Sequence, residues 1–256
     1  MRKELIPLLL SALFSLPLNA AEKATPFSLF EDSPINLAQK LELDDLKVGE
    51  YDTSLTLAAT SRPGTIYGPG LVFDGKTFKS WEGDTNKTWR IEDHALVGGS
   101  LKEPVPHNEF ICTKRSFTNF TLRLKFKLIG TEGFINGGVQ VRSKHVSNPP
   151  YELSGYQVDL GDPEWWGCLY DESRRNKVVA KSNIAEVNKV LKRNDWNEYR
   201  ITCEDKRIRA WLNGYQTFEY TEPDDSIPQY GIIGLQIHGG GKAEAWYTDI
   251  ALEELP

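Results

Sequence analysis

Residues 206–221 read KRIRAWLNGYQTFEYT, two alternating runs on either side of Asn213-Gly214. A period of two predicts a strand with one buried face. Asn-Gly between two such runs is the strongest short-range signal for a β-hairpin. In the first run the arginines and Trp211 share one parity, which we interpret as the outer face of the strand. The segment therefore predicts antiparallel β-structure.

The same period extends from residue 71 to the end of the chain. Expected strands are 71–73, 87–91, 95–97, 109–113, 119–129, 135–143, 154–160, 166–170, 177–181, 196–204, 206–212, 215–221, 230–238 and 243–253. Gly, Pro and Asn turn signals separate them, and neither a long helical period nor a fixed-length repeat is present. Many short strands predict an all-β fold, a two-sheet antiparallel sandwich or jelly roll.

Composition limits the class of partner. The chain has 256 residues, 39% of them hydrophobic, with 11 Phe, 10 Tyr and 7 Trp, so a disordered chain is excluded. Its formal charge of −6 and pI near 5.4 disfavour nucleic acid, which needs a basic face. All seven Trp lie beyond residue 80. An acidic protein rich in aromatics and Gly suits neutral ligands such as sugars.

The N-terminus has the pattern of a secretory signal peptide. Three residues, Met1-Arg2-Lys3, precede a mostly apolar run, 5–18, with Ala20 at the expected cleavage position. The run is too short and too Pro-broken for a retained membrane span. We expect an exported protein, periplasmic or secreted. The mature chain would carry −7, because the removed residues carry a net +1.

Three parts follow from these patterns. Residues 1–20 are the signal peptide, 21–70 an N-terminal extension, and 71–256 the β domain. The extension either packs on the domain edge or serves as a lid or partner segment. Three cysteines show no metal-ligand spacing, and we interpret them as buried apolar residues. Their disulfide state and the oligomeric state are open.

Three expected strands share an unusual polar face. Alternation places Gln140 and Arg142, Gln157 and Asp159, and Gln236 and His238 opposite apolar residues of the same strands. Planar amides, a guanidinium, a carboxylate and an imidazole suit sugar hydroxyls better than an ordinary solvent face does. If the strands are neighbours, the six residues form one cluster; the alternative is three unrelated exposed faces.

Two loops supply further candidates. Trp165 and Trp166 lie side by side in a turn region, where their rings are candidates for stacking on sugar; the alternative places one in the core. A mixed-charge loop, 170–176, follows the next short strand and contains Glu172 and Arg174. A solvated loop is the usual interpretation of such a run, and a functional one is the alternative.

Several segments in this order resemble the 3-keto-disaccharide hydrolase domain family, whose members are secreted or periplasmic bacterial proteins. They are LVFDGKT (71–77), WRIEDHALVGG (89–99), GGVQVRS (137–143), GYQVD (155–159), WNEY (196–199), WLNG (211–214) and GLQIH (234–238). The resemblance implies a concanavalin A-like jelly roll. Many relatives carry Glu at the position of Gln157 and Gln at that of Asp159. This chain resembles a subgroup with a Tyr-Gln-x-Asp strand instead.

The resemblance implies cleavage of 3-keto-glycosides. A ketone at sugar C3 acidifies the C2 hydrogen, so that a base can remove it, the C1 substituent can leave, and water can add back. Such a site needs a base, an acid, and positive charge near the enolate oxygen. The hypothesis assigns Asp159 and His238 as the acid–base pair, Arg142 to the enolate, and Glu172 as a reserve acid. The substrate contacts assigned are Gln140, Gln157, Gln236, Trp165, Trp166 and Arg174.

Alternatives stay open. No cofactor is certain, and a divalent metal held by Asp159, His238 and Glu172 is one option, although their spacing is not diagnostic. A non-catalytic, lectin-like sugar-binding module would use the same fold and polar face. A conventional glycosidase needs two opposed carboxylates, and only Asp159 lies securely on the polar face, so this alternative ranks last. The sequence does not identify the natural glycan or its linkage.

Overall fold

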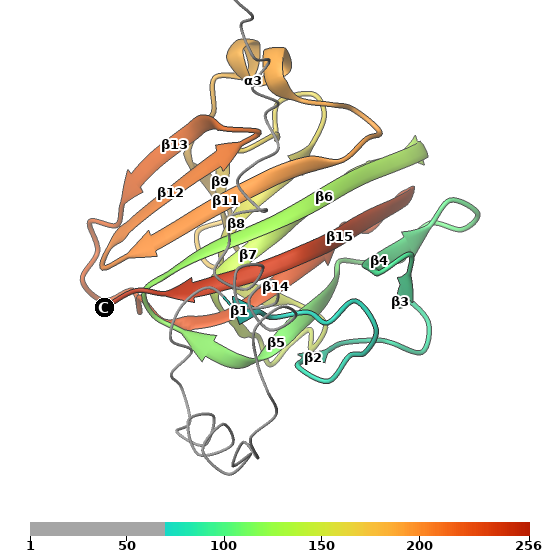
Figure 1. The fold of residues 1–256 in the computed structure, drawn as a ribbon, viewed down its shortest axis with the longest axis horizontal. Helices are drawn as coiled ribbons and strands as arrows, with labels where there is room; N and C mark the ends of the chain where they lie inside the picture. The colour runs from blue at the N-terminus through green and yellow to red at the C-terminus, as the bar shows by residue number, and fades with distance from the viewer. Residues whose placement is uncertain (1–69) are drawn as a thin grey trace, which may run out of the picture. The chain divides into compact units, whose positions relative to one another are not determined.

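The computed structural model describes residues 70–256, which form two antiparallel β-sheets and one short helix. The sheets lie face to face (Figure 1), as expected for a jelly-roll sandwich. The expected signal peptide and nearly all of the 21–70 extension lie outside the described residues. The helix, α3 (Ile184–Val190), has 7 residues. No helix in the described part is long and apolar enough to span a membrane.

Sheet A has its strands in the order β13-β12-β11-β6-β15-β4-β3, with β1 paired to β15. Their bounds are β13 (Tyr215–Thr221), β12 (Arg207–Leu212), β11 (Asn197–Glu204), β6 (Phe120–Gly133), β15 (Gly241–Glu254), β4 (Ala95–Ser100), β3 (Trp89–Glu92) and β1 (Gly70–Leu71).

Sheet B has the order β10-β9-β8-β7-β14-β5-β2. Its strands are β10 (Lys177–Ala180), β9 (Leu169–Glu172), β8 (Leu153–Gly161), β7 (Asn136–His145), β14 (Gly231–Ile237), β5 (Glu109–Phe117) and β2 (Trp81–Glu82). Neighbours that are far apart in sequence, such as β14 between β7 and β5, join the first and second halves of the domain.

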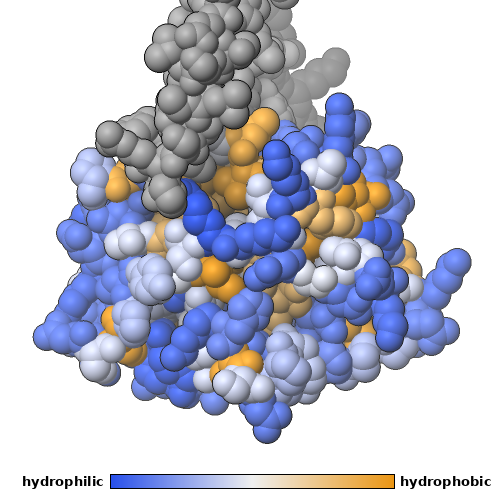
Figure 2. All heavy atoms as spheres, turned by 90° about the horizontal axis from the view of Figure 1, so that it is seen from below, coloured by the Kyte–Doolittle hydropathy of each residue, from blue (hydrophilic) through white to orange (hydrophobic). Residues whose placement is uncertain are grey.

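The core lies between the sheets and follows the alternation of the strands. Leu122, Leu124 and Phe126 of β6 face Val139 and Val141 of β7 within one buried cluster. Burial of these apolar side chains is the main favourable term in folding. On the face drawn in Figure 2, hydrophilic residues predominate and hydrophobic ones occupy smaller areas between them.

The hairpin that indicated the fold is confirmed. Asn213 and Gly214 join β12 to β13 with φ of 47° and 86°, the left-handed conformations that a two-residue hairpin turn requires. Trp211 lies half-buried on the outer face, beneath the Arg200 guanidinium at 3.8 Å from the ring centroid. The parity assigned to this strand is therefore correct.

Several elements differ from expectation, among them β2 (Trp81–Glu82), which was not predicted. The strand expected at 166–170 begins only at Leu169, because a turn comes first, with Trp165 N donating to Gly161 O (3.1 Å). The helix α3 was not expected, since seven residues are too few to show a helical period. Its N-cap Asn183 accepts hydrogen bonds from Ala185 N and Glu186 N. All three cysteines are buried, as expected, and all three are free.

Candidate active site on sheet B

The three polar strands are neighbours, in the order β8-β7-β14. Gln140 pairs with Gln157 across β7 and β8, and Gly138 lies between Asp159 on one side and Gln236 on the other. Because paired residues of adjacent strands point to the same face, Gln140, Gln157, Asp159 and Gln236 form one cluster on the face of sheet B away from the core. The expected cluster thus exists, for these four residues.

The amides of this cluster form a directional chain of hydrogen bonds. Ser143 Oγ donates to Gln140 Oε1, Gln140 Nε2 to Gln157 Oε1 (3.2 Å), and Gln157 Nε2 to both Asp159 Oδ1 (2.7 Å) and Gln236 Oε1 (3.1 Å). All five side chains are buried. Gln140 and Gln236 therefore lie beneath the surface, where they orient Gln157 and Asp159.

An open cavity of about 140 Å³ lies over the end of this cluster. Eight residues line it: Phe134, Asn136, Gln157, Asp159, Trp165, Tyr170, Glu172 and His238. Five of them were assigned to the site from the sequence, and Phe134, Asn136 and Tyr170 were not. The volume is close to that of a cavity that holds one six-membered ring.

Asp159 lies at the buried end of the cavity. Its Oδ1 accepts from Gln157 and its Oδ2 from the Cys168 thiol (3.4 Å), while Tyr199 OH donates to its backbone carbonyl (2.7 Å). Burial raises the pKa of Asp159 to about 8, against the lowering effect of the two side-chain hydrogen bonds. The carboxyl is therefore mostly protonated at neutral pH.

Glu172 lies at the end of β9, in the expected mixed-charge loop region. Burial raises the pKa of Glu172 to about 7, and the negative charge of Glu152 adds to the rise. Near neutral pH a substantial fraction of Glu172 is thus ionised while Asp159 keeps its proton. Two carboxyl groups with pKa values raised toward neutral pH in one cavity are suited to acid–base chemistry.

His238 lies directly after β14 and lines the same cavity. Its Nδ1 lies 2.7 Å from Gly239 O, so Nδ1–H donates to this carbonyl and the free lone pair of the neutral ring is on Nε2. The Phe134 ring meets the imidazole edge to face at 4.7 Å, and Trp165 meets Phe134 at 6.4 Å. The cavity therefore has an aromatic rim.

The role assigned to Arg142 at the enolate oxygen is contradicted by the structure. The strand bulges between Val141 and Lys144, and Arg142 has φ of 51°, so its side chain leaves the face of Gln140. Its guanidinium is buried and donates to four oxygens far from the cavity, those of Thr118 O, Asp205 O, Gln229 Oε1 and Asn119 Oδ1. It ties loops together and does not reach the site.

The substrate contacts assigned to Trp166 and Arg174 are also contradicted by the structure. Trp166 is buried in the main core, where its ring packs on Phe126 at 6.4 Å, so only Trp165 of the pair can meet a ligand. Arg174 lies over the Tyr156 ring at 4.4 Å and pairs with Asp171 at 2.7 Å. It lines no part of the cavity.

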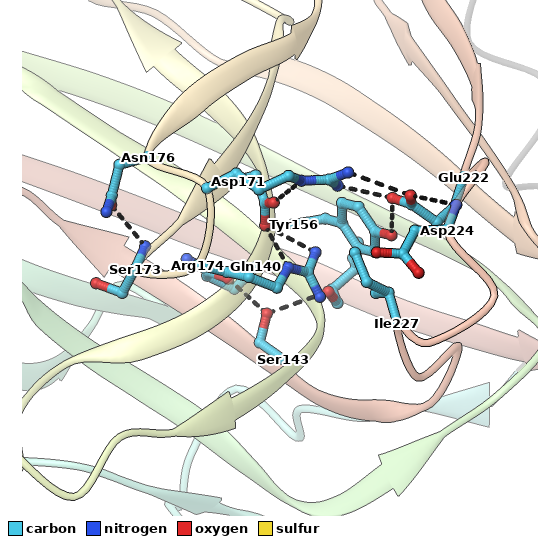
Figure 3. Close-up of polar contacts among 12 residues, drawn as sticks. Gln140, Ser143, Tyr156, Asp171, Ser173, Arg174, Asn176, Glu222, Asp224 and Ile227 are labelled. Carbon is cyan, nitrogen blue, oxygen red and sulfur yellow. Dashed lines mark hydrogen bonds and ion pairs between the residues drawn. The ribbon is translucent and has the colours of Figure 1, made fainter.

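The Arg174 contacts belong to an ionic network at the edge of the sandwich (Figure 3). Arg175 bridges two fully buried carboxylates, Asp171 of β9 and Glu222 just after β13, the latter at 2.7 Å. Glu222 also accepts from Tyr156 OH at 2.6 Å. These hydrogen bonds hold the pKa of Glu222 at about 2, against burial. The network joins sheet B to sheet A next to the strand that carries Glu172.

The residues missed from the sequence had weak signals. Tyr170 precedes Glu172 by two residues, so the period of two could have placed both on one face of β9. Asn136 opens β7, within the expected strand 135–143, but no role in the site was assigned to it. Phe134 lies in a loop, where side chains do not alternate between two faces as they do in a strand.

Asp159, Glu172 and His238, the candidate metal ligands, do not form a metal-binding site. Within residues 70–256, no three His, Cys, Asp or Glu side chains are grouped so as to hold a metal ion. Both oxygens of Asp159 accept hydrogen bonds from protein donors, and its raised pKa favours the neutral acid, which is a poor ligand.

Comparison with known proteins gives the family. The model of the 3-keto-alpha-glucoside-1,2-lyase-like domain matches residues 68–253. The chain belongs to this family. The match includes the whole cavity and both sheets, so the resemblance found in the sequence is confirmed. No curated protein matches the chain.

Solved structures share the fold. One described as a "putative glycosyl hydrolase" from Parabacteroides distasonis is 21% identical, with a TM-score of 0.56 over 74% of this chain and 94% of that one. A second with the same description from this organism is 25% identical, with a TM-score of 0.52 over 73% and 99%. The carbohydrate-binding module CBM66 from Bacillus subtilis is 17% identical, with a TM-score of 0.53 over 68% and 96%.

Proposed function

We propose that this protein cleaves 3-keto-glycosides by removal of the C2 proton and elimination of the C1 substituent, followed by addition of water. One observation carries the proposal. Asp159 and Glu172 line one small cavity, and burial raises the pKa of both carboxyls toward neutral pH, where each can give or take a proton. Family membership supports the substrate class.

Glu172 acts as the base and Asp159 as the acid. Ionised Glu172 takes the C2 hydrogen, the electron pair moves toward the C3 ketone, and the bond from C1 to the leaving oxygen breaks. Protonated Asp159 delivers its proton to that oxygen. Water then adds across the double bond formed. His238 can serve either proton transfer through Nε2, because its Nδ1 is engaged by Gly239 O.

Neutral donors replace the guanidinium that the sequence suggested for the enolate oxygen. The cavity offers the Asn136 amide and the Tyr170 hydroxyl, and burial together with Glu172 raises the pKa of Tyr170, which keeps its proton. Preorganised hydrogen-bond donors of this kind stabilise developing negative charge in a partly dry site. Trp165 and Phe134 provide aromatic faces for the C–H surface of the sugar.

One incubation tests the proposal. The purified protein is mixed with an ordinary disaccharide and with its 3-keto form, with and without a chelator, in deuterated water. We expect cleavage of the keto form alone, with deuterium at C2. Cleavage of the ordinary sugar without deuterium would instead indicate a conventional glycosidase that uses the same two carboxyls. Binding without cleavage would indicate a lectin-like module.

Variants sharpen this test. Asp159→Asn and Glu172→Gln keep the size of each side chain and remove its proton chemistry, so each should lower kcat by at least about 100-fold. Glu164→Gln is the matched control, since Glu164 is exposed in the loop of Trp165 and lines no part of the cavity. Full turnover by both site variants would refute the assignment.

We also propose that the protein is exported, on the basis of the N-terminal pattern in residues 1–20. Expression of the full chain in a bacterium, followed by fractionation and intact-mass measurement, tests this. We expect mature protein beginning near residue 21 outside the cytoplasm. Full-length protein confined to the cytoplasm would contradict it.

A further inference from the structure

A second surface adjoins the cavity on the side of His238. The loop that carries His107 and Asn108 packs directly on Gly239 and Gly240, where Gly239 N donates to Asn108 Oδ1 (3.2 Å). A Cβ at Gly239 would lie 2.6 Å from His107 Cα, so only glycine permits this approach. His107 and Asn108 are therefore fixed beside the residue that follows β14.

Tyr151 presents an aromatic ring on this surface. Its ring stacks on that of His107, with centroids 3.6 Å apart and an interplanar angle of 11°. The residue is nevertheless 38% exposed, so one ring face is supported by the imidazole while the other parts remain accessible. A supported, exposed aromatic ring suits the C–H face of a sugar.

Glu152 links this ring to the cavity. Its Oε2 accepts from Asn108 Nδ2 (3.3 Å) and its Oε1 from Leu153 N (3.0 Å), which orients the carboxyl. The same carboxylate raises the pKa of Glu172 in the cavity, and burial raises the pKa of Glu152 itself, against the lowering effect of its hydrogen bonds from Leu153 N and Asn108 Nδ2. Glu152 therefore lies within electrostatic reach of both places and supplies acceptors for hydroxyl groups.

Cavity size indicates what this surface is for. About 140 Å³ holds roughly one six-membered ring, so the second ring of a disaccharide must lie outside the cavity. We propose that Tyr151, supported by His107, and Glu152 form the subsite for the leaving-group sugar, a neutral pyranose joined through the C1 oxygen. This inference rests on the proposed function, because it assumes that the keto sugar occupies the cavity.

Two substrates with the same keto ring test the subsite. One is a 3-keto disaccharide, and the other is the methyl 3-keto-glucoside, whose leaving group is only methanol. Tyr151→Ala should lower kcat/KM for the disaccharide by about five- to tenfold, the effect of one lost stacking contact. For the methyl glycoside kcat/KM should stay within about twofold. Tyr151→Phe should retain the wild-type ratio between the two substrates.

Tyr230→Ala is the matched control. Tyr230 is 60% exposed and lies just before β14, at the opposite end of that strand from His238, so its removal should change neither substrate. An equal fall for both substrates with Tyr151→Ala, or a fall for neither, would overturn the subsite while leaving the elimination chemistry intact. No turnover of either substrate by the wild type would refute the proposed function and this subsite with it.

Discussion

Replacement of Asp159 by Asn should stabilise the protein at neutral and alkaline pH. The pKa of Asp159 is raised from 3.8 to about 8 in the folded protein, so the folded state keeps a proton that the unfolded chain has released. Between about pH 4 and pH 8 the folded state binds more protons, and stability therefore falls as pH rises. The rise in pKa corresponds to about 6 kcal/mol over the full range.

Asn removes this loss because it does not ionise, and it resembles the protonated carboxyl in shape. Its Oδ1 can still accept from Gln157 Nε2, and its Nδ2 meets the Cys168 sulfur. We expect the free energies of unfolding of the two proteins to agree within about 1 kcal/mol at pH 4. By pH 8 the variant should be more stable by several kcal/mol, about 5 at most.

Urea unfolding followed by Trp fluorescence between pH 4 and pH 9 measures the difference directly, and turnover is recorded on the same samples. Glu222→Gln is an informative comparison, because its pH dependence lies below about pH 4.5, so its difference from the wild type should stay constant between about pH 5 and pH 9. A difference for Asp159→Asn that is independent of pH, or that becomes destabilising above pH 7, would refute the reasoning about burial of Asp159.

Three further predictions concern residues around the site. Glu222→Gln should lower the free energy of unfolding by about 3–5 kcal/mol at pH 7, because it leaves Arg175 with one buried partner fewer. This difference from the wild type should shrink as pH falls from 4.5 toward 2, since the native carboxylate then takes up its proton. Urea unfolding midpoints measured at pH 7 and across this acidic range check both expectations. Trp166→Ala should lower the free energy of unfolding by about 3–5 kcal/mol, whereas Trp165→Ala should mainly raise KM; the reverse pattern would contradict their placement. Arg142→Met should destabilise by about 3 kcal/mol or more, because buried oxygens lose their donor, yet leave kcat of the folded protein unchanged; a selective loss of kcat would restore its catalytic role.

Alternation was enough to assemble much of the site from the sequence. Successive side chains of a strand point to opposite faces, so Gln140, Gln157, Asp159 and Gln236 could each be assigned to the polar face of its own strand without knowledge of the fold. The resemblance to the family implied the jelly roll, and the structure then showed that the three strands lie side by side. Tyr170 follows the same rule as Glu172, although it was not assigned from the sequence.

The alternation of side chains gave the wrong side-chain direction where the backbone departs from a regular strand. Arg142 shares the parity of Gln140, but a bulge with a positive φ turns its side chain toward other partners. Trp165 and Trp166 lie in a turn, where adjacency alone does not say which ring is buried. Neither a bulge at an ordinary L-residue nor the packing of a turn has a reliable local sequence signal.

Local sequence thus determined the β architecture, the hairpin at Asn213-Gly214 and the residue types available to a sugar, because each depends on neighbours in the chain. Tertiary structure decided the rest. It buried Asp159, which raised its pKa, and it brought Glu172 and Glu152 within electrostatic reach of each other. Desolvation and charge interaction act through space, so the raised pKa values of these two carboxyls arise only when the strands meet.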